Sequence, residues 1–320
     1  MTGEPLVSAI IATYNRADTV CKAVVSILEQ TYSNLEVIVV DDGSTDDTQS
    51  VLKSFGERIR CITQENSGPA AARNRGIAVS RGKILSFLDS DDLWKPTKIE
   101  RQVVLLQRAG PSVPCCLCNT TLQFASGRVT TAFEVAPIVP AFGEGIWTNA
   151  AEIFATRCIM FNQAVAIRRE VLEKVGGFDE SLWSLEDYDL ALKLSIEGPW
   201  TFIREPLVVW CQGVMNSLSQ KAFLEQVRLK ENQIKIHERF LVRLGDSDRF
   251  AELRKTVRRE ISRDYRQMRA AKLTQMGGWR AVIAGNFLHQ VEQSRKSLFA
   301  RSPSCPRMET VALDSARNEF

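Results

Sequence analysis

The sequence of 320 residues lacks the features that mark a membrane protein or a secreted disulfide scaffold. No apolar run reaches the roughly 18 to 20 residues that a membrane-spanning helix needs, and the N-terminus has no basic stretch followed by an apolar one. Histidine occurs only at His237 and His289, and the 8 cysteines lack a dense, regular spacing. We therefore expect a cytoplasmic protein in a reducing compartment.

A zinc site is disfavoured for the three cysteines that lie close together, Cys115, Cys116 and Cys118. A second cysteine pair or a histidine at zinc-site spacing is missing from the sequence. We interpret these cysteines as small buried residues of a strand.

The composition is that of a soluble globular protein, with 44% hydrophobic and 25% charged residues. The net charge of +3 conceals an asymmetry between the two parts of the chain. Residues 1–220 contain 20 Lys and Arg against 26 Asp and Glu, whereas residues 221–320 contain 21 against 12. The C-terminal part is therefore the candidate for contact with an anionic partner.

Short β-branched runs alternate with helical patterns from residue 6 to residue 110. Strands are expected at Val7 to Ala12, Leu35 to Val40, Arg58 to Thr63 and Ile84 to Leu88, and helices at Asp18 to Gln30, Thr45 to Phe55 and Pro69 to Val79. Continuous Val, Ile and Leu runs are typical of parallel strands that are buried on both faces. The order predicts an α/β fold with a doubly wound, mostly parallel sheet flanked by helices.

The remainder of the chain changes texture twice. Residues 111–147 are rich in Pro, Gly, Thr and Val, which suggests antiparallel strands and loops. A strand, two helices and a strand are then expected at Asn162 to Ile167, Arg169 to Val175, Leu185 to Glu197 and Leu207 to Cys211. Two long helices, at Lys221 to Leu244 and Asp248 to Met276, form a C-terminal helical extension.

Polar clusters follow each of the four N-terminal strands. They are Thr13-Tyr14-Asn15, Asp41-Asp42-Gly43-Ser44, Asn66-Ser67-Gly68 and Asp89-Ser90-Asp91. Ligands of doubly wound sheets bind beyond the carboxyl ends of the strands. We therefore expect a ligand site where these clusters meet.

The triplet Asp89-Ser90-Asp91 favours a divalent metal site. Crowded carboxylates raise one another's pKa unless a cation lies among them. Mg²⁺ or Mn²⁺ commonly takes one or two carboxylates and completes its shell with water and substrate phosphates. The alternative is a helix cap, with Asp91 or Asp92 capping the helix that begins near Pro96.

The other strand ends carry side chains suited to a nucleotide. Asp41 or Asp42 would accept hydrogen bonds from a base or a ribose, although a capping turn alone accounts for residues 45–47. Tyr14 would stack on a base, the alternative being a core tyrosine. Arg73 would pair with phosphate at a helix start, whereas Arg75 is expected in solvent.

These segments together resemble the family 2 glycosyltransferases of GT-A fold. The resemblance is carried by Ile11-Ala12-Thr13-Tyr14-Asn15, Val39-Val40-Asp41-Asp42-Gly43-Ser44-Thr45-Asp46, Gly68 with Ala72-Arg73-Asn74-Arg75-Gly76, and Leu88-Asp89-Ser90-Asp91-Asp92. It covers roughly residues 6–215. It implies an enzyme, a hexosyltransferase that moves a sugar from a nucleotide-sugar, usually UDP-linked, with inversion at the anomeric carbon.

The resemblance also implies roles for single residues. Tyr14 and Asp42, or Asp41 in its place, hold the base; Asp89 contacts the ribose or the metal, and Asp91 binds Mg²⁺ or Mn²⁺. The rest of the expected donor site is Thr13, Asn15, Arg73 and Ser90.

Gly176 to Glu180 and Glu186-Asp187-Tyr188 resemble the acceptor-side motif of the family, in which Asp187 is the catalytic base. Glu186 and Trp183 are expected on the same side. Inversion by one displacement requires a base opposite the leaving group whatever the family. The alternative is that these acids only favour a helix N-terminus.

The chain departs from the family at residues 210–214. The sequence there is Trp210-Cys211-Gln212-Gly213-Val214, without the Arg and His that many members carry. This loop is therefore not expected to contact phosphate or metal. The Gln-x-x-Arg-Trp signature of processive polysaccharide synthases is also missing, which favours transfer of one sugar.

These patterns divide the chain into a GT-A domain at 1–218, a basic helical extension at 219–300 and a flexible tail at 301–320. The domain comprises a nucleotide-binding half, 1–110, and an acceptor-binding half, 111–218. Residues 221–272 would contact an anionic membrane surface, at the inner face. The alternatives are a solvated helix face or a contact with another copy of the protein. Nucleic acid is disfavoured because no aromatic residues are interleaved with the charges.

The sequence disfavours two other functions. A non-catalytic nucleotide-sugar-binding or scaffold protein of the same fold is disfavoured by the intact Asp89, Asp91 and Asp187. A nucleotidyltransferase would need a glycine-rich basic loop after the first strand, where Tyr14-Asn15-Arg16 stands. The acceptor is expected to be a glycan or a lipid-linked sugar, as in polysaccharide synthesis.

Overall fold

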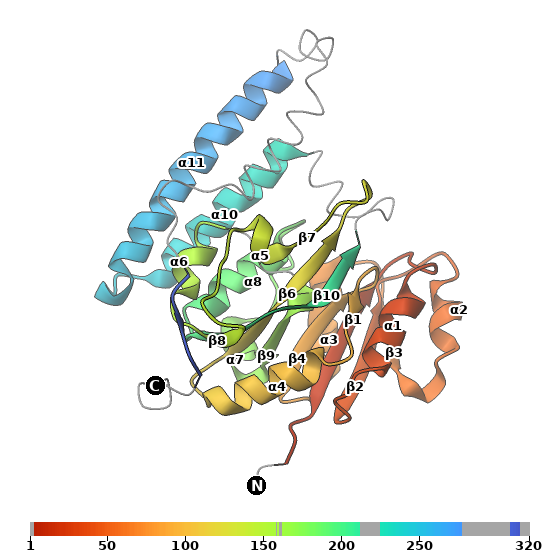
Figure 1. Ribbon diagram of the computed structural model, residues 1–320. Coiled ribbons are helices and arrows are strands. Elements are labelled where there is room, and N and C mark those ends of the chain that lie inside the picture. Colours follow the sequence, from red (N-terminus) through yellow and green to blue (C-terminus); the bar gives the residue numbers. More distant parts are fainter. Residues whose placement is uncertain (1–2, 158, 160–161, 212–224, 277–307, 314–320) are drawn as a thin grey trace.

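The apolar runs of the first 90 residues form four parallel strands at one side of a larger sheet (Figure 1). Its strands are β1 (Val7–Thr13), β2 (Leu35–Asp41), β3 (Arg60–Thr63) and β4 (Ile84–Asp89). β1 lies between β2 and β4, and β3 pairs with β2. Consecutive side chains of β1 and β4 are buried, so both faces of the sheet are covered here. The computed structural model describes residues 3–157, 159, 162–211, 225–276 and 308–313.

Helices connect these strands as the sequence predicts, and the α/β class is confirmed. They are α1 (Val20–Leu28), α2 (Thr48–Lys53), the single turn η1 (Gly56–Arg58), α3 (Pro69–Val79) and α4 (Lys98–Ala109). α3 lies very close to the sheet, because a Cβ on Gly76 would be 2.4 Å from Ile10 Cγ2. This close approach positions the N-terminal turn of α3 at the strand ends.

The second half continues the same sheet with mixed strand directions. Its strands are β5 (Leu93–Trp94), β6 (Cys115–Gln123), β7 (Val129–Thr131), β8 (Glu144–Trp147), β9 (Val165–Arg168) and β10 (Trp200–Cys211). β9 runs antiparallel to both β4 and β6, whereas β6 and β10 are parallel. The two halves therefore share one continuous sheet in the order β11-β8-β10-β6-β9-β4-β1-β2-β3, where β11 is the short strand Thr310–Val311.

Short helices of the second half surround the antiparallel strands. They are α5 (Ala132–Val135), α6 (Ala150–Phe154), the turn η2 (Asn162–Ala164), α7 (Arg169–Val175) and α8 (Glu186–Ser195). Cys115, Cys116 and Cys118 are buried on β6, where burial raises the pKa of each thiol.

The C-terminal extension consists of two long helices that pack against each other, α10 (Gln226–Leu244) and α11 (Ala251–Met276), separated by η3 (Asp248–Phe250). Figure 1 shows α10 between the body and α11, which extends away from the sheet. Among the described residues, no helix combines the length and apolar character that crossing a membrane requires.

Part of the expected flexible tail is ordered against the sheet. β11 (Thr310–Val311) pairs antiparallel with β8 and becomes the outermost strand. Glu309 contributes two further backbone contacts, accepting from Thr148 N at 3.1 Å and donating to Asn149 Oδ1 at 2.8 Å. A two-residue strand without an apolar run leaves no periodic signal, so pattern analysis missed it.

Candidate active site

Arg73 connects the end of the parallel sheet to the start of α8. Its Nη2 donates to Asp89 Oδ1 at 2.8 Å, and its Nη1 donates to Glu186 Oε1 at 2.6 Å. The guanidinium is buried and lies 5.4 Å from the ring centre of Phe178. A single cation thus brings together two acids that the sequence assigns to the donor side and the acceptor side.

Asp91 lies beside this bridge, and the nearest cation makes only a long contact with its carboxylate. Arg16 Nε is 3.8 Å from Asp91 Oδ2, which is an ion pair without a short hydrogen bond. Burial and the neighbouring Asp89 carboxylate raise the pKa of Asp91. The local field therefore favours an added cation or a proton at this carboxyl.

Asp92 is not a helix cap, which corrects one alternative for this residue. Its Oδ2 accepts from Gln163 Nε2 at 2.7 Å and its Oδ1 accepts from the Cys211 backbone at 3.0 Å. The helix that follows begins only at Lys98. Asp92 is fully buried and holds the end of β10 next to Asp89-Ser90-Asp91. Burial and the carboxylates of Asp89 and Asp91 raise the pKa of Asp92 well above the usual range.

The end of β1 presents an aromatic ring and a linking amide. Tyr14 is 44% exposed, which excludes the core alternative for this tyrosine. Asn15 adopts a left-handed backbone conformation, with φ of 51°, and its Oδ1 accepts from Thr45 N at 2.8 Å. Its own backbone N donates to Ser44 Oγ at 2.9 Å. Asn15 therefore joins the loops after β1 and β2.

The two acids after β2 differ in how fully they are bonded. Asp42 accepts from Gln64 Nε2 at 2.8 Å and from the backbone amides of Ser67 and Gly68 at 3.0 and 2.8 Å. These bonds order the loop that leads into α3. Asp41 accepts from Ser44 N at 3.1 Å through one oxygen.

The other oxygen of Asp41 and the hydroxyl of Thr13 are buried without a hydrogen-bond partner among the described residues. The two residues are opposite each other in the β1–β2 register. Unsatisfied buried polar atoms are costly, so this pair is suited to a polar ligand edge. Ser90 is also buried, between Asp89 and Asp91.

Asp187 lies in the first turn of α8, where its Oδ1 accepts from the Tyr188 backbone at 2.8 Å. Burial and the adjacent Glu186 carboxylate raise the pKa of Asp187 to about 7. Leu185, just before the helix, adopts a left-handed conformation with φ of 64°. Such strain in a residue other than glycine is concentrated at functional sites.

Trp183 is covered by the extension. The guanidinium carbon of Arg228, on α10, lies 4.4 Å from the centre of the Trp183 ring. The indole N–H of Trp183 is buried and has no hydrogen-bond partner in the described part of the chain. Trp183 therefore packs against Arg228 of α10 and keeps one buried donor without a partner in the described part of the chain.

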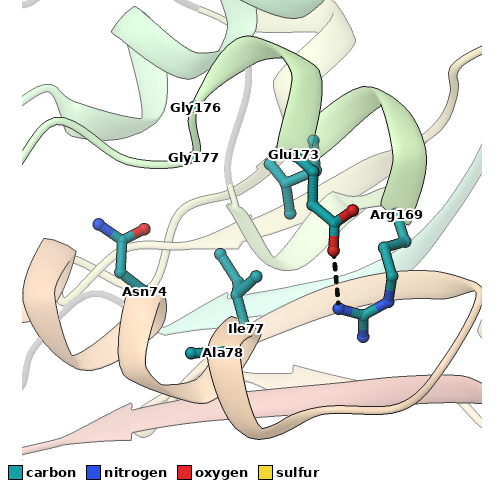
Figure 2. Close-up of a pocket in the computed structure, with 8 residues that line it drawn as sticks. Asn74, Ile77, Ala78, Arg169, Glu173, Gly176 and Gly177 are labelled. Atoms are coloured by element: carbon teal, nitrogen blue, oxygen red, sulfur yellow. Dashed lines mark hydrogen bonds and ion pairs between the residues drawn. The ribbon is translucent and has the colours of Figure 1, made fainter.

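Two recesses elsewhere on the surface do not include these residues. One of about 330 Å³ lies between α3 and α7, lined by Asn74, Ile77, Ala78, Arg169, Leu172, Glu173, Gly176 and Gly177 (Figure 2). The other, of about 500 Å³, lies between α8 and α10. In Figure 2 Arg169 is paired with Glu173, at 3.3 Å, so the polar groups there already have partners.

Asp89 and Asp91 fit a hard divalent cation. Within the described residues no group of three His, Cys, Asp or Glu side chains is arranged to hold a metal. Two carboxylates nevertheless match Mg²⁺ or Mn²⁺, which take their other ligands from water and phosphates. Asp89 has one oxygen beyond the one that Arg73 contacts.

Two residues near the acids were not singled out from the sequence, Arg16 and Gln163. Arg16 follows Asn15 directly, so a basic side chain at the same strand end was a usable signal. Gln163 lies 71 positions from Asp92 in a stretch without a motif, and only the fold brings them together.

The family model described as glycosyl transferase family 2 matches residues 8–175. An uncharacterised glycosyltransferase of Nostoc sp. is 30% identical over 284 residues, which are 85% of this chain and 84% of the relative. An Escherichia coli protein, UDP-Glc:alpha-D-GlcNAc-diphosphoundecaprenol beta-1,3-glucosyltransferase, is 30% identical over 74% of this chain and 90% of its own length.

A solved mannosyltransferase of Pyrobaculum calidifontis, in complex with GDP-Man and Mn²⁺, has the same fold. Its TM-score is 0.60 at 21% identity, over 93% of this chain and 85% of that one.

Proposed function

The chain belongs to glycosyl transferase family 2 and is a glycosyltransferase of GT-A fold, so we propose a reaction of this class for it. In this reaction one sugar is transferred from a UDP-sugar to a hydroxyl group, with inversion at the anomeric carbon. The observation that carries the proposal is the Arg73 bridge. It joins Asp89, at the end of β4, to Glu186, next to Asp187. Donor and acceptor groups can therefore meet at one place.

Asp187 acts as the general base. It accepts the proton of the acceptor hydroxyl while that oxygen bonds to the anomeric carbon, and the bond from this carbon to the diphosphate breaks on the opposite face. A base with a pKa of about 7 is well matched to this task near neutral pH. Glu186 and Trp183 line the acceptor side, and Arg73 limits the movement of Glu186.

The donor occupies the carboxyl ends of β1, β2 and β4. The exposed ring of Tyr14 stacks on the nucleobase of the donor. The polar atoms of Thr13 and Asp41 that lack a partner among the described residues face the polar edge of the same nucleobase. Asp42 and Asn15 order the surrounding loops.

The phosphate end of the donor lies at Arg73, Asp89, Ser90 and Asp91. Asp91 and Asp89 would hold Mg²⁺ or Mn²⁺, which would neutralise the diphosphate leaving group. Mn²⁺ in the Pyrobaculum calidifontis neighbour of the same fold supports this assignment.

The acceptor that we propose is a lipid-linked glycan at the cytoplasmic face of a membrane. The Escherichia coli relative, 30% identical, carries diphosphoundecaprenol in its acceptor name. The exposed cations of α11 support the membrane contact: Lys255, Arg258, Arg259, Arg266 and Arg269. At 100° per residue they fall within an arc of about 100° over a length of about 21 Å. We call this surface the α11 basic stripe.

The α11 basic stripe is available for an external anion. In the part of the helix that the structure describes, Arg258, Arg259, Arg266 and Arg269 form no ion pair, whereas Lys255 pairs with Glu252. The opposite side of the helix, with Leu253, Val257 and Asp264, is buried. Anionic lipid headgroups attract such cations with about 1 kcal/mol each.

Vesicle sedimentation tests the membrane contact. The double variant Arg266→Gln/Arg269→Gln is expected to bind phosphatidylglycerol vesicles roughly 10- to 30-fold more weakly than the unmodified chain. The control Lys22→Gln/Lys53→Gln removes two exposed charges from the opposite part of the molecule and should bind normally. Equal binding of all three proteins, or equal binding to neutral vesicles, contradicts the membrane contact.

A donor panel tests the transferase proposal. UDP-sugars and GDP-sugars are incubated with the chain and Mn²⁺ or with EDTA, and release of the nucleotide diphosphate is measured. We expect turnover with at least one UDP-sugar, loss with EDTA, and loss in Asp91→Asn. Turnover with GDP-sugars alone would contradict the assignment of UDP as the donor nucleotide. Full activity in EDTA would contradict the proposed dependence on a divalent metal.

A further inference from the structure

Helix α10 contacts the segment that carries the proposed base at three separate positions. The contacts are Arg228 on the Trp183 ring at 4.4 Å, Asn232 Nδ2 to the Ser184 carbonyl oxygen at 3.1 Å, and His237 Nε2 to Tyr188 Oη at 2.9 Å. They flank Asp187 on both sides in the sequence. The C-terminal extension, through α10, therefore helps to hold the first turn of α8 in place, in addition to the sheet.

The segment needs such support because its backbone is strained. Leu185 has φ of 64°, a conformation that costs a residue other than glycine about 1 to 3 kcal/mol unless the surroundings impose it. Asn232 binds the carbonyl immediately before Leu185, and Tyr188 is anchored three residues after it. Both ends of the strained turn are thus fixed by the same helix.

The anchor of Tyr188 is a buried polar chain. Tyr188 Oη donates to the Phe154 carbonyl at 2.8 Å, so its oxygen accepts from His237 Nε2. His237 Nδ1 lies 3.2 Å from Asp264 Oδ2, and Lys230 Nζ donates to Asp264 Oδ1 at 3.1 Å.

The hydroxyl hydrogen of Tyr188 goes to the Phe154 carbonyl, so Nε2 of His237 is the donor in the contact with Tyr188. His237 Nδ1 and Asp264 Oδ2 lie within ion-pair distance, but no hydrogen bond joins these two atoms among the described residues. His237 and Asp264 are at most 1% exposed, so solvent does not compete for these bonds. Although burial opposes it, the contacts with His237 and Lys230 lower the pKa of Asp264 and keep it ionised. Lys230, Asp264 and His237 therefore form a buried polar cluster that ends on the Tyr188 hydroxyl.

We propose that α10, through the Tyr188–His237–Asp264 chain and Asn232, is a positioning element that fixes Asp187 for proton transfer. The link is short, because the Tyr188 backbone N–H is the donor to Asp187 Oδ1. The inference rests on the proposed role of Asp187 as the base. It makes the extension part of the catalytic unit, with His237 and Tyr188 as positioning residues.

The test compares two Tyr→Phe variants that each remove one hydroxyl from the extension contacts. Tyr188→Phe breaks the anchor, whereas Tyr265→Phe removes the hydrogen bond from Tyr265 to Glu238, at 3.1 Å on the exposed side of α10 and α11. In Tyr188→Phe we expect kcat for the active UDP-sugar to fall about 10- to 100-fold with the donor KM unchanged. Tyr265→Phe should keep the kcat of the unmodified chain.

Hydrogen–deuterium exchange gives a readout that does not depend on activity. Amides of residues 186–190 should exchange faster in Tyr188→Phe than in Tyr265→Phe, with protection of β1 and β4 unchanged. His237→Gln, which keeps a hydrogen-bond donor near the Nε2 position, should retain a higher kcat than His237→Leu.

Unchanged kcat and unchanged exchange in Tyr188→Phe would overturn the positioning role. If the unmodified chain transfers no sugar at all, the proposed function fails. The exchange comparison then still decides whether α10 holds this turn.

Discussion

Asp187 is the side chain that we propose as the general base of the transfer. Asp187→Asn keeps the size and removes the basic oxygen, so we expect kcat to fall about 10²- to 10⁴-fold with donor binding retained. The measurement is release of UDP beside donor titration by calorimetry. Asp189→Asn, on the same helix but paired with Lys193 at 2.9 Å, is the matched control and should retain most activity. Equal loss in both variants would point to α8 folding instead of a base.

The pH dependence follows from the same carboxyl. Burial and Glu186 raise the pKa of Asp187 to about 7, so below that pH the base is protonated and idle. We expect kcat/KM to rise about tenfold per pH unit up to about 7 and then level off. A profile that stays flat from pH 5.5 to 8 contradicts this assignment.

The contribution of Asp187 to folding stability should change with pH in the opposite direction to kcat/KM. The folded state binds the Asp187 proton more tightly than the unfolded chain does, since the pKa rises from 3.8 to about 7. The contribution of Asp187 to stability therefore decreases as the pH rises through this window. Asp187→Asn is expected to unfold at a higher temperature than the unmodified chain at pH 8, with a smaller difference at pH 4. Thermal scans at the two pH values measure it.

Single residues show where sequence patterns stop being informative. The positions of Asp89 and Asp91 could be predicted because they lie at the end of an apolar strand, and that of Asp187 because it lies at the start of a helix. The two partners of Arg73 lie 16 and 113 positions away, and no local signal pairs them. Asp92 looked like a cap because capping is a local pattern, whereas its actual partners come from remote segments.

Among the elements, α3 depends on the missing side chain at Gly76. Gly76→Ala would place Cβ 2.4 Å from Ile10 Cγ2 and push α3, with Arg73, away from the sheet. We expect a loss of about 1 to 3 kcal/mol in the free energy of unfolding and a lower kcat from the displaced bridge. The control Gly143→Ala meets nothing within 4 Å and should leave both unchanged. Denaturant titration and UDP release are the measurements.

Elements with strong periodicity were predictable, and those made by pairing were not. The helix at Pro69–Val79 and the strands of the parallel sheet have the expected bounds within one or two residues. The strand expected from Asn162 begins only at Val165, because the first three residues form η2. The short strands β5, β8 and β11 exist through their partners in the sheet, which sequence spacing alone does not reveal.

For the whole molecule, β11 protects the edge of the sheet. A chain that lacks residues 306–320 would expose the backbone groups of β8, so we expect a lower unfolding temperature and faster aggregation on heating. A loss of 1 kcal/mol corresponds to about 1.5 °C for a chain of 320 residues. Deletion of residues 314–320 alone retains β11 and is the control. Identical melting and light scattering of the two deletions would contradict this role.

The shared sheet has a consequence for building chimaeras from related enzymes. β9, from the second half of the chain, lies between β4 and β6, and β5, from the first half, pairs with β10. A crossover near residue 110 therefore has to match two backbone ladders and the Arg73 bridge at once. We therefore expect an exchange of residues 111–218 as one block to disturb the pairing of the sheet. Loops at the strand ends are the smallest units that can be grafted without disturbing the scaffold.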